Sequence, residues 1–372
     1  MKAHRLIAAL ALLALAGIPW GRPALAAQAC PGTWSAVPTP STSTASRLNG
    51  VAFASRDDGW AVGTRKARHL ATLTEHWNGS SWTIVPSPNA SKRWNVLLDV
   101  SAAGPRDVWA VGADYDGGGM AMHWNGVRWR IVPTPKTNAM QLVGVTVIAT
   151  DDAWAVGNVG KGIEHWDGRR WSVVPGAAVS GSYRLNGVDA ISISDIWAVG
   201  LHSSGKTSEP ETLAERWNGA KWVREPMSFR AHDITLYDVS VAAPDDAWAV
   251  GYVQSKQGAP RHTLTLHWDG SAWTKVPSPN VGAYDNRLLS VAAIDGNHAW
   301  AVGWRPTAPN LQGIRTLVLR WNGTSWKVVS SPNVGPGANV LSSVAAGPDA
   351  TWAVGKHGTP NGSRTLALRS CH

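Results

Sequence analysis

The sequence lacks the motifs of the enzyme classes that short patterns identify. It contains no Gly-x-Ser-x-Gly nucleophile elbow, no spacing typical of metal ligands and no phosphate-binding loop. A glycoside hydrolase needs two carboxylates across the scissile bond. Nothing in the linear order favours any pair among the scattered candidates, which are Asp116, Glu209, Glu211, Asp233 and Asp285. We therefore predict no catalytic residue, no metal site and no cofactor.

Blocks of like charge and long apolar runs are also scarce. The formal net charge is +9, and the basic residues are scattered among acidic ones without forming a block, which predicts no nucleic-acid partner. The long apolar run, 6–18, follows a basic start and precedes Ala24-Leu25-Ala26. This pattern predicts a secretory signal peptide over 1–26, because the run is too short to span a membrane. We expect a secreted, extracytoplasmic protein, monomeric and without a membrane span, that comprises 27–372.

Tryptophan is abundant, with 23 residues, and it marks a sevenfold repeat. The word Trp-Ala-Val-Gly recurs at intervals of roughly 43–52 residues, a period typical of propeller blades. Each repeat contains four short apolar segments, which predict four antiparallel strands. The sequence therefore predicts an all-β fold, a seven-bladed β-propeller of four-stranded antiparallel blades in a single domain. The seven copies begin at Trp60, Trp109, Trp154, Trp197, Trp248, Trp300 and Trp352.

The two ends of the chain look like complementary parts of one blade. The segment 30–38 matches the end of a repeat, and 365–371 matches the start of the same hairpin. We expect three C-terminal strands to be closed by an outer strand from the N-terminus, which hides sheet edges. Aligned in this way, Cys30 and Cys371 fall at the same position, so we predict a disulfide between them.

These repeats resemble the secreted bacterial propellers related to the kelch and galactose-oxidase-like superfamily. The resemblance rests on seven copies of the Trp-Ala-Val-Gly word, five of which follow Asp-x, and on Trp-Asn-Gly-x-x-Trp hairpins, and it covers the whole mature chain. It implies the propeller fold and does not specify an activity. The sequence lacks the glycine doublet of kelch repeats. Its cysteines lie at the ends, where they cannot form the Tyr–Cys cofactor of the copper oxidases in that superfamily.

Loop lengths predict that the two faces of the ring differ. We name the strands of a blade A to D from the axis outward. The A–B and C–D turns are uniform in length, whereas we expect the B–C and D–A connections to vary. In an antiparallel blade these variable connections emerge on one face, and function tends to lie on such loops. The candidate ligand-binding residues are the aromatic side chains of these loops and the arginines beside them, Arg93, Trp94, Tyr115, Tyr183, Arg184, Tyr252, Tyr284, Trp304 and Arg305.

Two other patterns have structural interpretations. The histidines recur at one repeat position that arginine occupies elsewhere, so we interpret them as contacts between blades and not as metal ligands. The segment 114–119 looks like part of a calcium loop but lacks the downstream carboxylate, so we expect a flexible polar turn. The four histidines are His76, His123, His165 and His267.

Three functions remain open from the sequence. The first is a secreted, non-catalytic propeller that binds an extracellular glycan or protein through the B–C/D–A face. The second is a secreted carbohydrate-active hydrolase or lyase at the axial mouth, which would place carboxylates there. The third is a structural or assembly module with a contiguous apolar patch.

Overall fold

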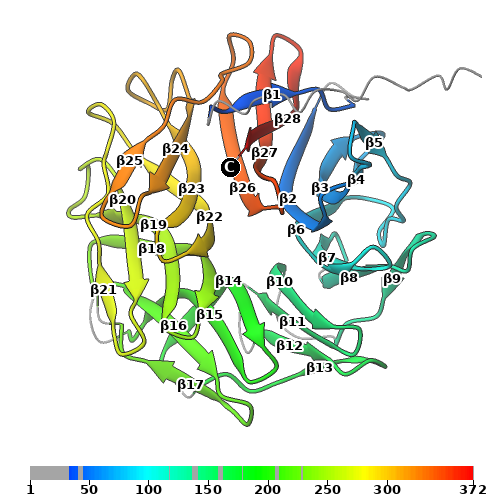
Figure 1. Cartoon of the computed structure of the whole chain (residues 1–372), viewed down its shortest axis with the longest axis horizontal. Coiled ribbons are helices and arrows are strands. Elements are labelled where there is room, and N and C mark those ends of the chain that lie inside the picture. The colour runs from blue at the N-terminus through cyan, green and yellow to red at the C-terminus, as the bar shows by residue number, and fades with distance from the viewer. Residues whose placement is uncertain are drawn as a thin grey trace, which may run out of the picture.

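The computed structural model describes residues 33–40, 45–116, 118–135, 141–157, 162–177, 179–205, 209–227 and 229–371. They form seven four-stranded antiparallel sheets that follow one another around a central axis (Figure 1). The predicted all-β, seven-bladed propeller is thereby confirmed. Among the described residues, no helix has the length and apolar character that a membrane crossing requires.

The inner strand A of every blade carries the Leu-x-x-Val pattern and a β-bulge. The leucine is fully buried, as Leu48 is at 0% exposure, and the register shifts just after it, between Leu48 and Gly50 in blade 1. A bulge inserts one residue and re-aims the side chains that follow it. The same shift recurs in all seven blades. The inner strands are β2 (Ser46–Ser55), β6 (Asn95–Gly104), β10 (Leu142–Ala149), β14 (Ser182–Ser192), β18 (Asp233–Ala243), β22 (Arg287–Asp295) and β26 (Asn339–Ala346).

Strand B contains the Trp-Ala-Val-Gly word and is buried on both faces by the neighbouring blades. Trp60, Ala61 and Val62 are each 0% exposed. The glycine is required because a Cβ at Gly63 would lie 2.0 Å from the carbonyl oxygen of Arg47 on strand A. These strands are β3 (Asp58–Lys66), β7 (Asp107–Asp114), β11 (Asp152–Gly157), β15 (Asp195–Ser203), β19 (Asp246–Gln254), β23 (His298–Arg305) and β27 (Ala350–Thr359).

Strands C and D supply tryptophans that surround the strand B tryptophan of the preceding blade. The ring of Trp60 lies 4.7 Å from that of Trp124 and 5.0 Å from that of Trp129, centroid to centroid. Such tilted and edge-to-face contacts add to the burial of the rings and hold adjacent blades together. The C strands are β4 (Leu70–Trp77), β8 (Gly119–Trp124), β12 (Ile163–Trp166), β16 (Glu211–Trp217), β20 (His262–Trp268), β24 (Arg315–Trp321) and β28 (Gly362–Cys371). The D strands are β5 (Trp82–Ile84), β9 (Trp129–Val132), β13 (Trp171–Val173), β17 (Trp222–Glu225), β21 (Trp273–Lys275), β25 (Trp326–Val328) and β1 (Ser35–Val37).

Blade 7 closes the ring in the way that the sequence predicts. Its strand order is β26-β27-β28-β1, so the N-terminal strand forms its outer edge (Figure 1). Ser35 pairs with Arg369 and Val37 with Ala367. No described cysteine is a free thiol. Cys30 lies outside the described residues, so its disulfide with Cys371 stays a prediction.

The repeated histidines bind partners within their own blades, whereas the sequence interpretation placed their contacts between blades. His76 Nε2 lies 3.0 Å from Asp58 Oδ1, and its ring lies 4.6 Å from that of Trp60 in the same blade. A histidine of strand C therefore links the first residue of strand B to its tryptophan. The same arrangement holds for His123, His165 and His267. Among the described residues, no group of three or more His, Cys, Asp or Glu side chains could hold a metal ion.

The D–A loops vary less than the sequence analysis expects. In blade 1, Thr72 N–H donates a 2.9 Å hydrogen bond to Asn89 Oδ1 of the Ser-Pro-Asn segment 87–89. Threonine and asparagine make the same bond in blades 5 and 6, through 278–280 and 331–333. Three D–A loops thus share the same threonine–asparagine hydrogen bond, and the diversity of this face lies mainly in the B–C hairpins.

Candidate functional site

The B–C/D–A face contains a cluster of charged and aromatic side chains at the inner ends of blades 5 and 6. We call it the inner-rim cluster. It forms where β18 and β22 begin and where β19 and β23 end, because these ends meet on one face of antiparallel blades. Its members are Asp233, Tyr237, Tyr252, Arg261, Asp285, Arg287 and Trp304.

The guanidinium of Arg287 lies between two aromatic rings. Its Cζ atom is 5.1 Å from the centroid of Tyr252 and 4.9 Å from that of Trp304. Its Nη2 donates to Asp285 at 3.0 Å, while its buried Nε has no hydrogen-bond partner among the described residues. The side chain is 20% exposed. Stacking on aromatic rings holds an arginine in one orientation. Its exposed N–H groups that have no partner can then donate hydrogen bonds to a ligand.

A second arginine and two carboxylates hold this arrangement rigid. Arg261 Nη2 lies 2.9 Å from Asp233 and its Nη1 3.3 Å from Asp285. Tyr252 Oη donates to Asp233 at 3.1 Å. Burial acts to raise the pKa of Asp285, but hydrogen bonds from the Arg261 backbone and from Arg287, with the charges of both arginines, lower it overall. Both carboxylates are thus paired, and Arg287 still has free N–H capacity.

Tyr237 extends the inner-rim cluster along the inner strand β18. Its ring centroid lies 5.9 Å from that of Tyr252. Burial and the neighbouring Tyr252 raise the pKa of Tyr237, and the nearby Arg287 and Arg184 act in the opposite direction. The phenol therefore remains a neutral hydrogen-bond donor at physiological pH. Sequence reasoning found Tyr252 and Trp304 of this cluster but missed Tyr237, Arg261 and Arg287, because a loop pattern does not show which strand ends meet. The predicted Arg184 is not a member of the cluster, although its charge acts on Tyr237.

On the opposite side of the ring, Arg93, Trp94 and Tyr115 come together on blade 2. The guanidinium carbon of Arg93 lies 4.1 Å above the Tyr115 ring. The Trp94 and Tyr115 rings meet edge to face at 6.1 Å. The three side chains were predicted separately, from a D–A loop and a B–C hairpin, and the structure places them in one group.

Three of the remaining predicted residues, Tyr183, Tyr284 and Arg305, do not belong to either group. Tyr183 is half-buried against the apolar core between blades 3 and 4. Tyr284 is half-buried, and its carbonyl accepts a 2.8 Å hydrogen bond from Asn286 Nδ2. Arg305 ends β23 and pairs with Arg315 across the B–C hairpin. The nine predicted residues therefore do not form one site.

The axial channel holds three aspartates that the sequence analysis did not select. Asp99, Asp189 and Asp238 line a central cavity of about 310 Å³ together with serine, threonine, alanine and valine side chains. Burial, reinforced by the charges of the other two aspartates, raises the pKa of Asp99 to about 8. Burial is also the main reason that the pKa is about 7 for Asp189 and about 6 for Asp238.

Each axial aspartate accepts a hydrogen bond from the backbone of the next blade. Asp99 Oδ2 accepts from Val145 N at 2.9 Å, and Asp189 Oδ2 from Val241 N at 2.8 Å. Asp238 Oδ2 accepts from Val291 N at 3.0 Å. Serines make the same kind of link elsewhere, through Ser101, Ser240, Ser290 and Ser343. These polar side chains therefore join neighbouring inner strands around the axis.

Three glutamates are buried between blades at one position of strand C. Glu75 is 0% exposed, and neither of its carboxylate oxygens has a hydrogen-bond partner among the described residues. Burial raises the pKa of Glu75 to about 8. Glu164 and Glu215 occupy the same position in blades 3 and 4, and burial raises the pKa of each to about 7. Other blades have an apolar side chain at this position, Met122, Leu266, Leu319 or Leu368.

Comparison with known proteins shows the fold class. No protein-family model matches the chain, and no curated protein matches it. Solved structures do. YCF48 bound to D1 peptide is 16% identical with a TM-score of 0.56, over 91% of this chain and 97% of that one. The RRP9 WD40 repeats are 9% identical with a TM-score of 0.59, over 92% and 98%. An ulvan lyase of polysaccharide lyase family PL25 is 10% identical with a TM-score of 0.57, over 89% and 96%.

The chain is therefore a seven-bladed β-propeller. At these identities the likeness shows the fold and does not transfer a ligand or an activity. The similar structures belong to YCF48, WD40 and polysaccharide lyase propellers, so they do not support a particular relation to the kelch and galactose-oxidase-like superfamily.

Proposed function

We propose that this protein is a secreted, non-catalytic propeller that binds an extracellular glycan or protein through its B–C/D–A face. The observation that carries the proposal is the stacked guanidinium of Arg287, whose Cζ lies near the Tyr252 and Trp304 rings and whose Nη1 has no acceptor among the described residues. An arginine of this kind recognises carboxylate or other acceptor groups, and the rings beside it offer apolar contact. The rigid pairing of the surrounding charges keeps the site preorganised, which favours binding.

The test is a binding screen on glycan and peptide arrays at low and high salt, followed by calorimetry on the ligand found. We expect Trp304→Ala and Arg287→Gln to weaken binding about tenfold or more, and Arg287→Lys to restore part of it through its charge. Tyr284→Ala is the matched control, because Tyr284 lies on the same face outside the cluster. Thermal melting verifies that each variant folds. Binding that is unchanged in both cluster variants refutes this site.

An enzyme at the axial mouth is the second candidate, and the axial aspartates favour it. Asp99, Asp189 and Asp238 have pKa values of about 8, 7 and 6, which suit acid–base chemistry near neutral pH. Each of them, however, already accepts a backbone hydrogen bond that joins two blades. Turnover assays on neutral and acidic polysaccharides test this alternative, with Asp189→Asn as the variant. Activity that Asp189→Asn abolishes would replace the binding proposal.

An assembly module has less support. The exposed large apolar side chains among the described residues belong to five different blades and include Leu70, Val127, Ile193 and Leu311. An assembly surface calls for a contiguous apolar patch.

A further inference from the structure

Two short segments of blades 1 and 2 carry four exposed cations. Lys66 and Arg68 lie on the hairpin between β3 and β4, and Lys92 and Arg93 lie on the loop between β5 and β6. None of the ion pairs among the described residues includes any of the four. Arg224, Arg230, Arg261 and Arg287 on blades 4 to 6 are instead paired with carboxylates.

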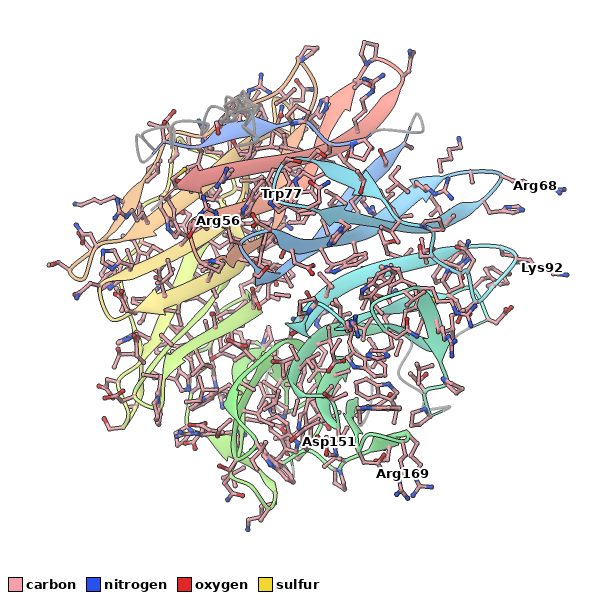
Figure 2. The ribbon with its side chains drawn as sticks, turned by 45° about the vertical axis from the view of Figure 1, so that its right-hand side comes forward. Arg56, Arg68, Trp77, Lys92, Asp151 and Arg169 are labelled. Carbon is pink, nitrogen blue, oxygen red and sulfur yellow. The ribbon has the colours of Figure 1, made fainter. Side chains whose placement is uncertain are left out.

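The two segments are adjacent and firmly attached to the blades. Thr72 on β4 donates to Asn89 of the β5–β6 loop at 2.9 Å, which fixes this loop against the start of the strand that follows the hairpin. Ser91 N–H and the Arg93 N–H are both held within the loop, by Asn95 Oδ1 at 2.8 Å and by Ser91 Oγ at 3.1 Å. Figure 2 shows Arg68 and Lys92 projecting from the same side of the molecule.

Aromatic rings lie beside these cations. Tyr115 is 43% exposed, and its backbone N–H donates to the Trp94 carbonyl at 2.9 Å, which ties the blade 2 hairpin to the loop. Arg93 covers one face of the tyrosine ring, and Trp94 meets its edge. The nearby carboxylates are Asp114 and Asp116. Asp114 accepts the Asp116 N–H at 2.7 Å, and neither forms an ion pair with the four cations.

We infer that Lys66, Arg68, Lys92, Arg93, Trp94 and Tyr115 form a binding patch for an acidic polysaccharide, which we call the blade 1–2 patch. Four unpaired cations on two adjacent segments match a ligand with repeated negative groups, because a single anion would engage one or two of them. Aromatic rings at the same place match the apolar faces of sugar rings. The patch rests on the proposed binding role of this face but lies across the ring from the inner-rim cluster (Figure 1).

The experiment measures binding of the folded full-length protein to immobilised alginate, dextran sulfate, neutral dextran and poly-glutamate over a range of salt concentrations. We expect binding to alginate or dextran sulfate that weakens with salt, and none to neutral dextran. The difference between the first two polymers distinguishes carboxylate from sulfate recognition. The variant Lys66→Gln/Arg68→Gln/Lys92→Gln should weaken binding about tenfold and flatten its salt dependence. Tyr115→Ala should weaken polysaccharide binding about threefold or more and leave poly-glutamate binding unchanged.

The matched control is Arg169→Gln/Arg170→Gln/Lys221→Gln, which removes the same charge from exposed C–D turns on the opposite face. If this control weakens binding as much as the patch variant does, the attraction is a general effect of net charge and the blade 1–2 patch is refuted. Poly-glutamate binding as tight as alginate binding and independent of Tyr115 would assign the patch to acidic proteins instead. If the patch variant binds as tightly as the wild type while Trp304→Ala loses binding, only this inference is overturned and the inner-rim site stays intact.

Discussion

Replacing Glu75 by methionine should stabilise the propeller, and increasingly so as the pH rises. Glu75 is fully buried in the apolar contact between blades 7 and 1, and blade 2 has Met122 at the same position. Burial raises the pKa of Glu75 from 4.5 to about 8. Below pH 4.5 the carboxyl is neutral in both the folded and the unfolded chain. Between pH 4.5 and pH 8 the Glu75 carboxyl ionises only in the unfolded chain, so the wild type loses stability as the pH rises.

The size of the effect follows from the shift. One pKa unit corresponds to about 1.4 kcal/mol, so the shift of Glu75 lowers the free energy of unfolding by up to about 5 kcal/mol between pH 4.5 and pH 8. The variant Glu75→Met lacks this loss. Its advantage over the wild type should therefore grow by roughly 3–5 kcal/mol over that interval, added to a smaller pH-independent gain from removing an unpartnered polar group.

The assay is chemical denaturation of both proteins at pH 4.5, 6 and 8, followed by tryptophan fluorescence. Leu266→Met is the control at the equivalent position of blade 5, and its effect should not depend on pH. The reverse substitution, Met122→Glu, should make blade 2 sensitive to rising pH. An advantage of Glu75→Met that is the same at pH 4.5 and pH 8 would refute the reasoning, because it would mean that Glu75 does not remain protonated in the folded protein.

Two further predictions concern the closure and the axis of the ring. Cys371→Ser should lower the free energy of unfolding by about 4–5 kcal/mol, because the predicted bond to Cys30 closes a loop of roughly 340 residues. Non-reducing peptide mapping checks the bond itself, and two free thiols would disprove it. Ser290→Ala should lower stability by about 1–3 kcal/mol, because Ser290 Oγ accepts from Val344 N at 3.1 Å and donates to Asp238 Oδ2 at 2.8 Å. In denaturant unfolding, exposed Thr324→Ala is its control, and equal effects in the two variants would contradict the role of the axial bonds.

Much of the fold was predictable because the repeat encodes local and neighbour contacts together. Trp60, Ala61 and Val62 lie on a strand that is covered on both faces by neighbouring blades. Successive residues of a strand face opposite sides, so an uninterrupted apolar run indicates a strand that is buried on both faces. The closure was predictable for a similar reason. The segment 35–37 matches the outer strands of other blades, and the structure pairs it with β28.

The candidate site was predictable only in part. Off-repeat aromatic residues identified Trp94, Tyr115 and Trp304, since nothing in the blade pattern requires them. The sequence did not show that Arg287 would lie between Tyr252 and Trp304, because these side chains come from strands of two different blades. It also placed the histidine contact between blades, whereas the partner of His76 is Asp58 of the same blade, 18 residues away.

The number of blades, the order of their strands and the way the ring closes could be predicted from the repeat pattern, because each of them depends on a pattern that recurs along the chain. The environment of side chains at positions where the repeats differ depends on how the blades pack against one another. Glycine, serine and aspartate share one position of the inner strand, and Asp99 and Asp238 enter the channel because the bulge turns them there. Glutamate, methionine and leucine share one position of strand C, and Glu75 is buried because the neighbouring blade covers it. Ring closure sets the dielectric surroundings of these carboxyl groups, and a linear pattern does not contain that information.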